Sequence, residues 1–323
     1  MKKARIIETG SYYPEVEVDN FMLEKHMDTN DEWIVQRTGI SSRRFSNLTT
    51  SQMAYRAALD VIERSNIDKN DVDLIIVATF TPDNFTPSCA NDVARLLELD
   101  NDIPSFDINA ACSGYIYALQ VARGLIESNI YQTILIVGAE NISRHLDFND
   151  RSCAILFGDG AGATLITSDE VGVIDTKINN KPDYDKTIIV PNGVSIKTPF
   201  TTNLNENKTT VSMKGQEVFK FATSVFVKEI KEVLKKNNLS IDDIAYIIPH
   251  QANVRIIETA IKLLKIDSKK VYVNLDKMGN TSAASIPIAL DELYKSNKIK
   301  RNDKIILIAF GSGLTYGVSL IEW

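Results

Sequence analysis

Cys112 is the residue of this sequence whose surroundings best suit a chemical reaction. It lies in the stretch DINAACSGYIYAL (107–119), after a short apolar run and before a run with helical periodicity. A turn that opens a helix would place its sulfur near unpaired backbone N–H groups and the positive end of the helix dipole, which favour the thiolate. Free cysteine is also among the residues most often buried as a small hydrophobe. The stretch alone therefore leaves a nucleophile and a core cysteine open.

His250 and Asn280 are two further candidates for chemistry. His250 follows Pro249 at the end of the apolar run 244–249, and a helix-like run begins a few residues later. Catalytic groups of α/β sheets gather at such carboxyl ends of strands. Asn280 lies in MGNTSAAS before another helix-like run, where capping of that helix is the alternative role.

Cysteine, histidine and asparagine in this order also occur in papain-like proteases. Cys112 lacks the C-G-S-C-W context of that class, and the chain shows no secretory or disulfide features. A Cys-His-Asn hydrolase is therefore the remote alternative.

Two glycine-rich stretches follow apolar residues. FGDGAGATLI (157–166) lacks the Lys-Ser/Thr pair of a phosphate loop and does not open a helix, so we expect a structural strand or turn there. In AFGSGLTYG (309–317), the glycines would allow a backbone N–H group to point at a substrate oxygen. Neither stretch contains the G-x-S-x-G pattern of a hydrolase elbow.

The elements that must position these residues alternate between strand and helix, which predicts an α/β fold. Continuous apolar runs predict strands that are covered on both faces, at residues 74–79, 133–138, 244–249 and 304–310. Amphipathic runs predict helices at residues 51–65, 115–129, 217–237 and 284–297. The polar segment 179–210 is expected to be a long connection or an excursion between the two halves.

The order of elements in the first half repeats in the second, which indicates a duplicated unit. Each half has a long apolar strand, a helix, a short strand (104–110 or 271–275), a turn with its helix, and another long strand. On this alignment the turns of Cys112 and Asn280 are equivalent, and the His250 loop matches the loop near Thr81. Pseudo-twofold packing would bring the three candidates to one place.

Composition excludes several classes of protein. The chain of 323 residues has a formal net charge of −6 and 44% hydrophobic residues, which argues against a general nucleic-acid binder. It has no apolar run long enough for a signal peptide or a membrane span, so we expect a cytoplasmic protein. Cys89, Cys112 and Cys153 lack C-x-x-C spacing, so we expect neither a disulfide framework nor a metal site.

Several motifs together resemble one known family. DINAACSGYIYAL, FGDGAGA, PHQANVRII, GNTSAASIPIAL, AFGSGLTYG and TNDEWIVQRTGI (29–40) are similar to the motifs of β-ketoacyl-acyl-carrier-protein synthase III, within the thiolase superfamily. The similarity runs from about residue 4 to the C-terminus and keeps the order of the motifs. It implies a duplicated thiolase-like fold of five layers, αβαβα, with one half at 1–170 and the other at 171–323, in a homodimer.

The resemblance implies an acyltransferase that starts fatty acid synthesis. Cys112 would take the acyl group of an acyl-CoA, and malonyl-acyl carrier protein would then decarboxylate and attack it, giving a 3-oxoacyl product. His250 and Asn280 would stabilise the negative charge of that decarboxylation. The backbone N–H groups of Cys112 and Ser312 would form a second oxyanion hole, and Phe310 would keep the pocket apolar.

The resemblance also implies how the substrates bind. Trp33 and Arg151 would sandwich the adenine of CoA, with Arg37 near the phosphates and Asn253 on the pantetheine. Carrier-protein docking would fall to a small basic surface made of Lys220, Arg255 and Lys262. No cofactor is expected, since acyl-CoA is a substrate.

Thr86 departs from the best-known enzyme of the family, which has a phenylalanine that limits the acyl pocket across the dimer. The smaller side chain would leave room for a longer or branched primer. A synthase III-like acyltransferase or condensing enzyme of a specialised-metabolite pathway is therefore the alternative function. A catalytically silent subunit is disfavoured because Cys112, His250 and Asn280 are all retained.

Overall fold

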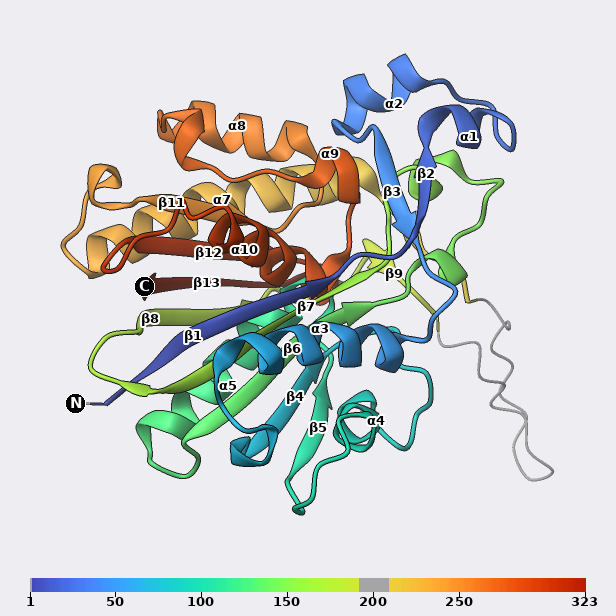
Figure 1. The fold of residues 1–323 in the computed structure, drawn as a ribbon. Coiled ribbons are helices and arrows are strands. Elements are labelled where there is room, and N and C mark those ends of the chain that lie inside the picture. The colour runs from blue at the N-terminus through green and yellow to red at the C-terminus, as the bar shows by residue number, and fades with distance from the viewer. Residues whose placement is uncertain (1, 192–208) are drawn as a thin grey trace.

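The chain forms two mixed sheets at the centre of the molecule (Figure 1). A computed structural model describes residues 2–191 and 209–323. The first sheet has the order β1-β7-β6-β4-β5, with strands β1 (Lys3–Tyr12), β4 (Leu74–Ala78), β5 (Ser105–Ile108), β6 (Thr133–Glu140) and β7 (Gly160–Asp169). The second has the order β11-β12-β13-β8, with strands β8 (Val173–Asn180), β11 (Tyr246–Pro249), β12 (Lys304–Phe310) and β13 (Thr315–Glu322).

The two sheets repeat one topology, which confirms the duplicated α/β fold. The pairs β4–β6 and β11–β12 are parallel, whereas β6–β7 and β12–β13 are antiparallel. The outer pairs β1–β7 and β8–β13 are antiparallel as well. The division expected between residues 170 and 171 falls between β7 and β8.

The expected short strand at 271–275 is wrong, because only one bridge forms there, between Ile247 and Val271. The Gln251 side chain takes the place of further strand pairing. Its amide donates to the Tyr272 carbonyl at 3.2 Å and accepts from the Asn274 N–H group at 3.1 Å. Helix α9 (Leu275–Met278) then begins, so among the described residues the second sheet has no counterpart of β5.

Helices form the other three layers (Figure 1). The central layer holds α5 (Gly114–Glu127) and α10 (Ser285–Lys295), whose apolar residues pack with both sheets. Helices α3 (Thr50–Ser65) and α4 (Cys89–Leu96) cover the outer face of the first sheet. Helices α7 (Gly215–Lys236) and α8 (Val254–Leu264) cover that of the second. The order of layers is αβαβα.

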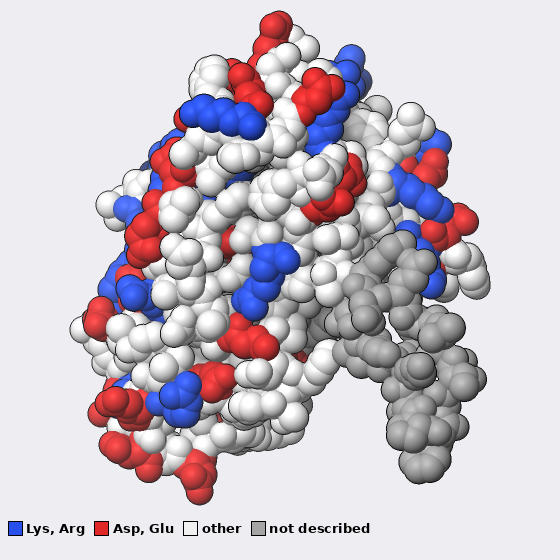
Figure 2. Space-filling view, turned by 90° about the vertical axis from the view of Figure 1, so that its right-hand side faces the viewer, with Lys and Arg blue, Asp and Glu red and all other residues white. Residues whose placement is uncertain are grey.

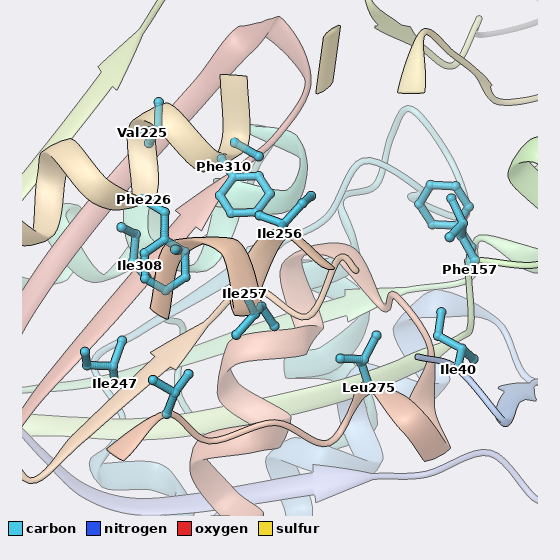
Figure 3. Packing of buried hydrophobic residues seen from close by; sticks show 14 of the residues in the cluster. Ile40, Phe157, Val225, Phe226, Ile247, Ile256, Ile257, Leu275, Ile308 and Phe310 are labelled. Atoms are coloured by element: carbon cyan, nitrogen blue, oxygen red, sulfur yellow. The ribbon is translucent and has the colours of Figure 1, made fainter. Parts of the chain in front are cut away.

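Small and apolar residues explain this packing. Figure 3 shows Phe226 of α7, Ile257 of α8 and Ile308 of β12 together in the core beneath the outer helices. In the central layer, a Cβ atom on Gly114 would lie 3.1 Å from Ala78 Cβ and 3.3 Å from Ala283 Cβ. Small side chains therefore allow the start of α5 to pack closely against β4 of its own half and against the turn before α10 of the other half.

The remaining elements lie around one end of the sheets (Figure 1). They are β2 (Val16–Asp19), α1 (Asn20–Glu24), α2 (Asp31–Thr38), β3 (Ser42–Phe45), α6 (Arg151–Ala154), β9 (Ile188–Ile189) and β10 (Ser212–Met213). Within the expected polar connection 179–210, residues 192–208 lie outside the described part of the chain. Among the helices of the described residues, none has the length and apolar character needed to cross a membrane.

Candidate active site

A cavity of about 800 Å³ brings residues of both halves together. Cys112 and Phe157 of the first half line it with His250, Asn280 and Phe310 of the second. The three residues with candidate chemistry thus share one pocket. The pocket also contains the following expected site residues: Trp33, Arg37, Lys220, Asn253, Arg255 and Ser312.

Cys112 lies in a short 3₁₀ turn, η2 (Ala111–Ser113), that leads directly into α5. Ala111 has a left-handed φ of 46°. Thr315 of the second half donates a hydrogen bond to the Ala110 carbonyl at 2.9 Å. The other half of the chain therefore holds the turn that carries the sulfur.

The turn of Asn280 repeats this geometry. Ser282 begins the 3₁₀ turn η6 (Ser282–Ala284) with a φ of 50°, and α10 follows. In both turns an asparagine side chain accepts from the N–H group two residues on: Asn109 from Ala111 at 3.2 Å, and Asn280 from Ser282 at 2.9 Å. The turns are equivalent as expected, but the structural counterpart of Asn280 is Asn109.

Burial raises the pKa of the Cys112 thiol to about 12. Contact with the Ser282 hydroxyl acts in the opposite direction and lowers the pKa, while the negative charge of Glu140 raises it. The helix start was expected to favour a thiolate, but desolvation by burial outweighs that effect. The thiol must therefore lose a proton when its sulfur reacts.

His250 follows β11 and is 1% exposed. Its Nδ1 atom lies 2.7 Å from the Ser285 hydroxyl, and its ring packs edge-on against Phe310 with 5.4 Å between ring centres. The Ser285 oxygen accepts from the Gln251 N–H group, which leaves its own hydrogen for Nδ1. We assign the ring hydrogen to Nε2 on this hydrogen-bond pattern. Burial lowers the pKa of His250 to about 3, so the ring is a neutral hydrogen-bond donor.

Asn280 is fixed by backbone pairing between the two halves. Its N–H group donates to the Leu156 carbonyl at 2.8 Å, and its carbonyl accepts from Gly158 at 3.0 Å. The close approach requires glycine, since a Cβ atom on Gly158 would lie 2.4 Å from the Met278 carbonyl oxygen. The Ser282 N–H group donates to the Asn280 side-chain oxygen. The amide hydrogens are therefore the part of the Asn280 side chain that donates to a substrate. Within the stretch 157–166, the residues from Gly160 onward form β7, so the expected strand is present.

Gly311 packs directly against Cys112. A Cβ atom on Gly311 would lie 2.8 Å from the Cys112 backbone nitrogen and 3.1 Å from its Cβ atom. Ser312 follows at the start of the turn η7 (Ser312–Leu314), with its hydroxyl bound to the Ile188 carbonyl at 2.7 Å. Gly311 thus lets the expected pair of oxyanion donors, Cys112 and Ser312, approach each other.

We expect Gly311→Ala to displace the Cys112 turn, because the added methyl group has no space. Acylation of Cys112 should slow by about 100-fold, and the free energy of unfolding should fall by about 1 to 3 kcal/mol. Intact-mass kinetics and thermal unfolding measure these effects. Gly124→Ala in α5 is the matched control, because its Cβ atom would meet nothing within 4 Å. An unchanged acylation rate in the Gly311 variant would contradict this account.

Of the expected CoA residues, Trp33, Arg37 and Asn253 line the pocket, and Arg151 lies against the Trp33 ring. The guanidinium carbons of Arg37 and Arg151 lie 4.3 Å and 4.7 Å from the centre of the Trp33 ring. Arg151 stacks directly on Trp33 and leaves no room for a third ring between them. The expected binding of adenine between these two side chains is therefore blocked in this conformation. The Asn253 amide donates to the Arg37 carbonyl at 3.0 Å, which ties these elements together.

The expected docking residues lie on α7 and α8. Lys220 and Arg255 line the pocket, whereas Lys262 is exposed two turns further along α8. Lys220 forms an exposed ion pair with Glu217 at 3.0 Å. Figure 2 shows one face of the molecule, on which acidic and basic groups lie near one another. Because Lys220 is exposed and paired with Glu217, its attraction for a carrier protein would act over a short range.

Thr86 is exposed and does not line the pocket of its own chain. Its expected role at the acyl pocket requires a second copy and stays a prediction. Glu140 was not among the residues predicted from the sequence. It is fully buried at the end of β6 and close enough to Cys112 to raise the pKa of the thiol. An acidic residue at the end of an apolar strand was the available signal.

No cluster of three or more metal-ligating side chains occurs in the described part of the chain.

The fold and the pocket define a class of protein. Two equivalent α/β units, with a cysteine at the start of one central helix and a histidine and an asparagine from the other unit, are the features of a thiolase-fold condensing enzyme. The family model of 3-oxoacyl-[acyl-carrier-protein] synthase III matches residues 106–182, and the family model of its C-terminal part matches residues 234–323. The β-ketoacyl-[acyl-carrier-protein] synthase III of Clostridioides difficile (strain 630) is 45% identical over 324 residues, which are 99% of this chain and 98% of that protein. The chain belongs to the 3-oxoacyl-[acyl-carrier-protein] synthase III family.

Solved structures agree with this assignment. The 3-oxoacyl-[acyl-carrier-protein] synthase III of Aquifex aeolicus VF5 is 41% identical and covers 100% of both chains with a TM-score of 0.92. The priming β-ketosynthase of the R1128 polyketide biosynthetic pathway is 31% identical, with a TM-score of 0.91 over 99% of this chain and 96% of that one. The enzyme is an acyltransferase that catalyses the condensation initiating fatty acid synthesis.

Proposed function

We propose that the enzyme condenses an acyl-CoA primer with malonyl-acyl carrier protein through an acyl group carried on Cys112. The products are 3-oxoacyl-acyl carrier protein, CoA and CO₂. The observation that carries the proposal is the shared cavity of Cys112, His250 and Asn280. A ping-pong reaction needs a nucleophile and a site for charge stabilisation that two substrates use in turn.

In the first step, the Cys112 sulfur attacks the thioester carbon of acyl-CoA. The oxygen gains negative charge, which the N–H groups of Cys112 and Ser312 stabilise. The C–S bond to CoA then breaks, and CoA leaves as a thiolate. The contact of Gly311 with the Cys112 backbone supports this pairing of donors.

In the second step, the malonyl group loses CO₂ and negative charge develops on its thioester oxygen. The neutral His250 ring donates to that oxygen from Nε2, and Asn280 donates from its amide. The resulting carbanion attacks the acyl carbon and releases the Cys112 thiolate. Phe310, which packs against His250, gives the reacting carboxylate an apolar surface.

Substrate entry involves the mouth of the pocket. Adenine binding requires Arg151 to move off the Trp33 ring, with Arg37 near the phosphates and Asn253 beside the pantetheine. Lys220, Arg255 and Lys262 receive the acidic carrier protein. The exposed residues Phe85 and Thr86 suit contact with a second copy in a homodimer.

The compartment proposed for the enzyme is the cytoplasm. The three cysteines of the described residues are free, which suits a reducing compartment. The proposed reaction uses CoA as a substrate and requires no cofactor.

The primer is the open part of the substrate assignment. The small residue Thr86 favours primers that are branched or longer than acetyl. The similarity to a polyketide priming enzyme supports a role in a specialised pathway as the second candidate function. An acyl-CoA series with malonyl-acyl carrier protein should yield CO₂ and 3-oxoacyl product with more than one primer. Reaction with acetyl-CoA alone would contradict the role of Thr86. Acylation of Cys112 with any primer but without CO₂ release would favour the acyltransferase alternative.

A further inference from the structure

Glu140 is a fully buried carboxyl group beside the candidate nucleophile. It ends β6 and receives hydrogen bonds from the loop after β4, through the hydroxyl groups of Thr79 and Thr81 and the N–H groups of Phe80 and Thr81. It forms none of the ion pairs found among the described residues. A carboxyl group buried among neutral donors is costly to keep charged, so a structural role alone explains it poorly.

Ser282 connects Glu140 to Cys112. The Ser282 hydroxyl donates to Glu140 Oε1 at 3.2 Å. Ser282 begins η6, which packs against the turn η2 that holds Cys112, and its hydroxyl lowers the pKa of the thiol. Ser282 is fully buried. Its backbone N–H group also holds the Asn280 side chain. Ser282 thus binds a buried carboxyl group and lies beside the turn that carries the sulfur.

The duplicated fold shows that the turn itself does not need this hydroxyl. Ser282 and its counterpart Ala111 have the same left-handed conformation, with φ of 50° and 46°. Alanine therefore satisfies the backbone of this turn in the first half. The serine in the second half is explained by its hydroxyl, which binds Glu140 beside the turn of Cys112.

We propose that Glu140 acts through Ser282 as the store for the proton that Cys112 loses while it carries an acyl group. As the sulfur bonds to the acyl carbon, its proton passes to the Ser282 oxygen, and the Ser282 hydrogen passes to the Glu140 carboxylate. The CoA thiolate leaves and takes a proton from water. When condensation breaks the bond between Cys112 and the acyl carbon, Glu140 returns the proton to the sulfur through Ser282. This inference rests on the proposed function, in which Cys112 carries the acyl group.

The surroundings of Glu140 suit a proton store. Burial raises its pKa to about 8, against the hydrogen bonds from Thr81, Phe80, Thr79 and Ser282 that lower it. The group can therefore gain or lose a proton near neutral pH. The titratable groups that its charge affects are Cys112 and Cys89, while its hydrogen-bond partners are hydroxyl and amide groups.

Glu140→Gln and Ser282→Ala test the proposal in the full-length enzyme. Each should slow single-turnover acylation of Cys112 at pH 7 by about 100-fold. In wild type, the acylation rate should rise with pH and level off between pH 7 and 9, and this inflection should be absent from both variants. Asp159→Asn is the matched control, because Asp159 is also buried and bound to Ser143 and Ser46 but has no contact with Cys112. Rates and inflections unchanged from wild type in folded variants, or the same loss in Asp159→Asn, would overturn the proposal.

Two further measurements separate this proposal from its premises. Alkylation of Cys112 by iodoacetamide across the same pH range needs no substrate, and it should show the same inflection in wild type only. If acyl-CoA fails to acylate wild type while alkylation depends on Glu140, the proposed function fails and the connection to Cys112 stands. If Glu140→Gln does not fold, Ser282→Ala decides the question, because Ala111 already shows that alanine fits the turn.

Discussion

Replacement of Cys112 by serine is expected to abolish the condensation, with the rate falling by at least about 1,000-fold. The hydroxyl group occupies nearly the same space, but it is a far weaker nucleophile than the sulfur. Its position at the start of α5, against Gly311 and beside Ser282, remains. The measurement is product formation from acyl-CoA and malonyl-acyl carrier protein, with intact mass to detect the acyl group.

Cys89→Ala is the control for this prediction. Cys89 is 2% exposed at the start of α4, and burial raises its pKa to about 12 as it does that of Cys112. It does not line the pocket, so its loss should leave acylation unchanged. Acylation of Cys112→Ser at the wild-type rate would show that another residue carries the acyl group.

His250→Ala and Asn280→Ala are each expected to lower the rate of malonyl decarboxylation by about 100- to 1,000-fold. Each change removes one hydrogen-bond donor from the negative charge that develops on the thioester oxygen. Cys112 acylation should change much less. CO₂ release from the preformed acyl-enzyme measures the first effect, and burst kinetics measure the second. Full decarboxylation in both variants would contradict the assigned charge stabilisation.

The pH dependence of decarboxylation tests the charge of His250. Because its pKa is lowered to about 3 by burial, the ring is neutral throughout the range in which the enzyme works. CO₂ release from the acyl-enzyme should therefore show no inflection near the ordinary histidine pKa of about 6.5. His145→Ala is the matched control, since His145 binds the Thr209 carbonyl away from the pocket. A fall in rate on acidification through pH 6.5 that disappears in His250→Ala would show that the ring is charged in the free site.

The sequence predicted the core of the fold because its strands are continuous apolar runs. Sheet strands covered by helices on both faces leave that pattern, and β4, β6 and β12 lie where it indicated. The repeated order of elements predicted the two equivalent sheets. It did not predict that the strand at 271–275 ends after one bridge, because a side chain distant in sequence, Gln251, takes over its hydrogen bonds.

The sequence predicted which turns meet in the pocket, but it did not predict the contacts that their side chains make. The internal repeat brought Cys112, Asn280 and His250 together and matched their turns, but it did not identify Asn109 as the residue equivalent to Asn280. The effect of burial on the Cys112 pKa depends on how closely two halves pack, and no local motif contains that information. The stacking of Arg151 on Trp33 likewise joins residues more than 100 positions apart.

The most direct test of the central claim is the mass of the protein through one catalytic cycle. Incubation with acyl-CoA should add one acyl group, which peptide mapping should place on Cys112. Addition of malonyl-acyl carrier protein should then remove it with release of one equivalent of CO₂ and formation of 3-oxoacyl-acyl carrier protein. An acyl group on another residue, or one that persists after malonyl-acyl carrier protein is added, would contradict the account.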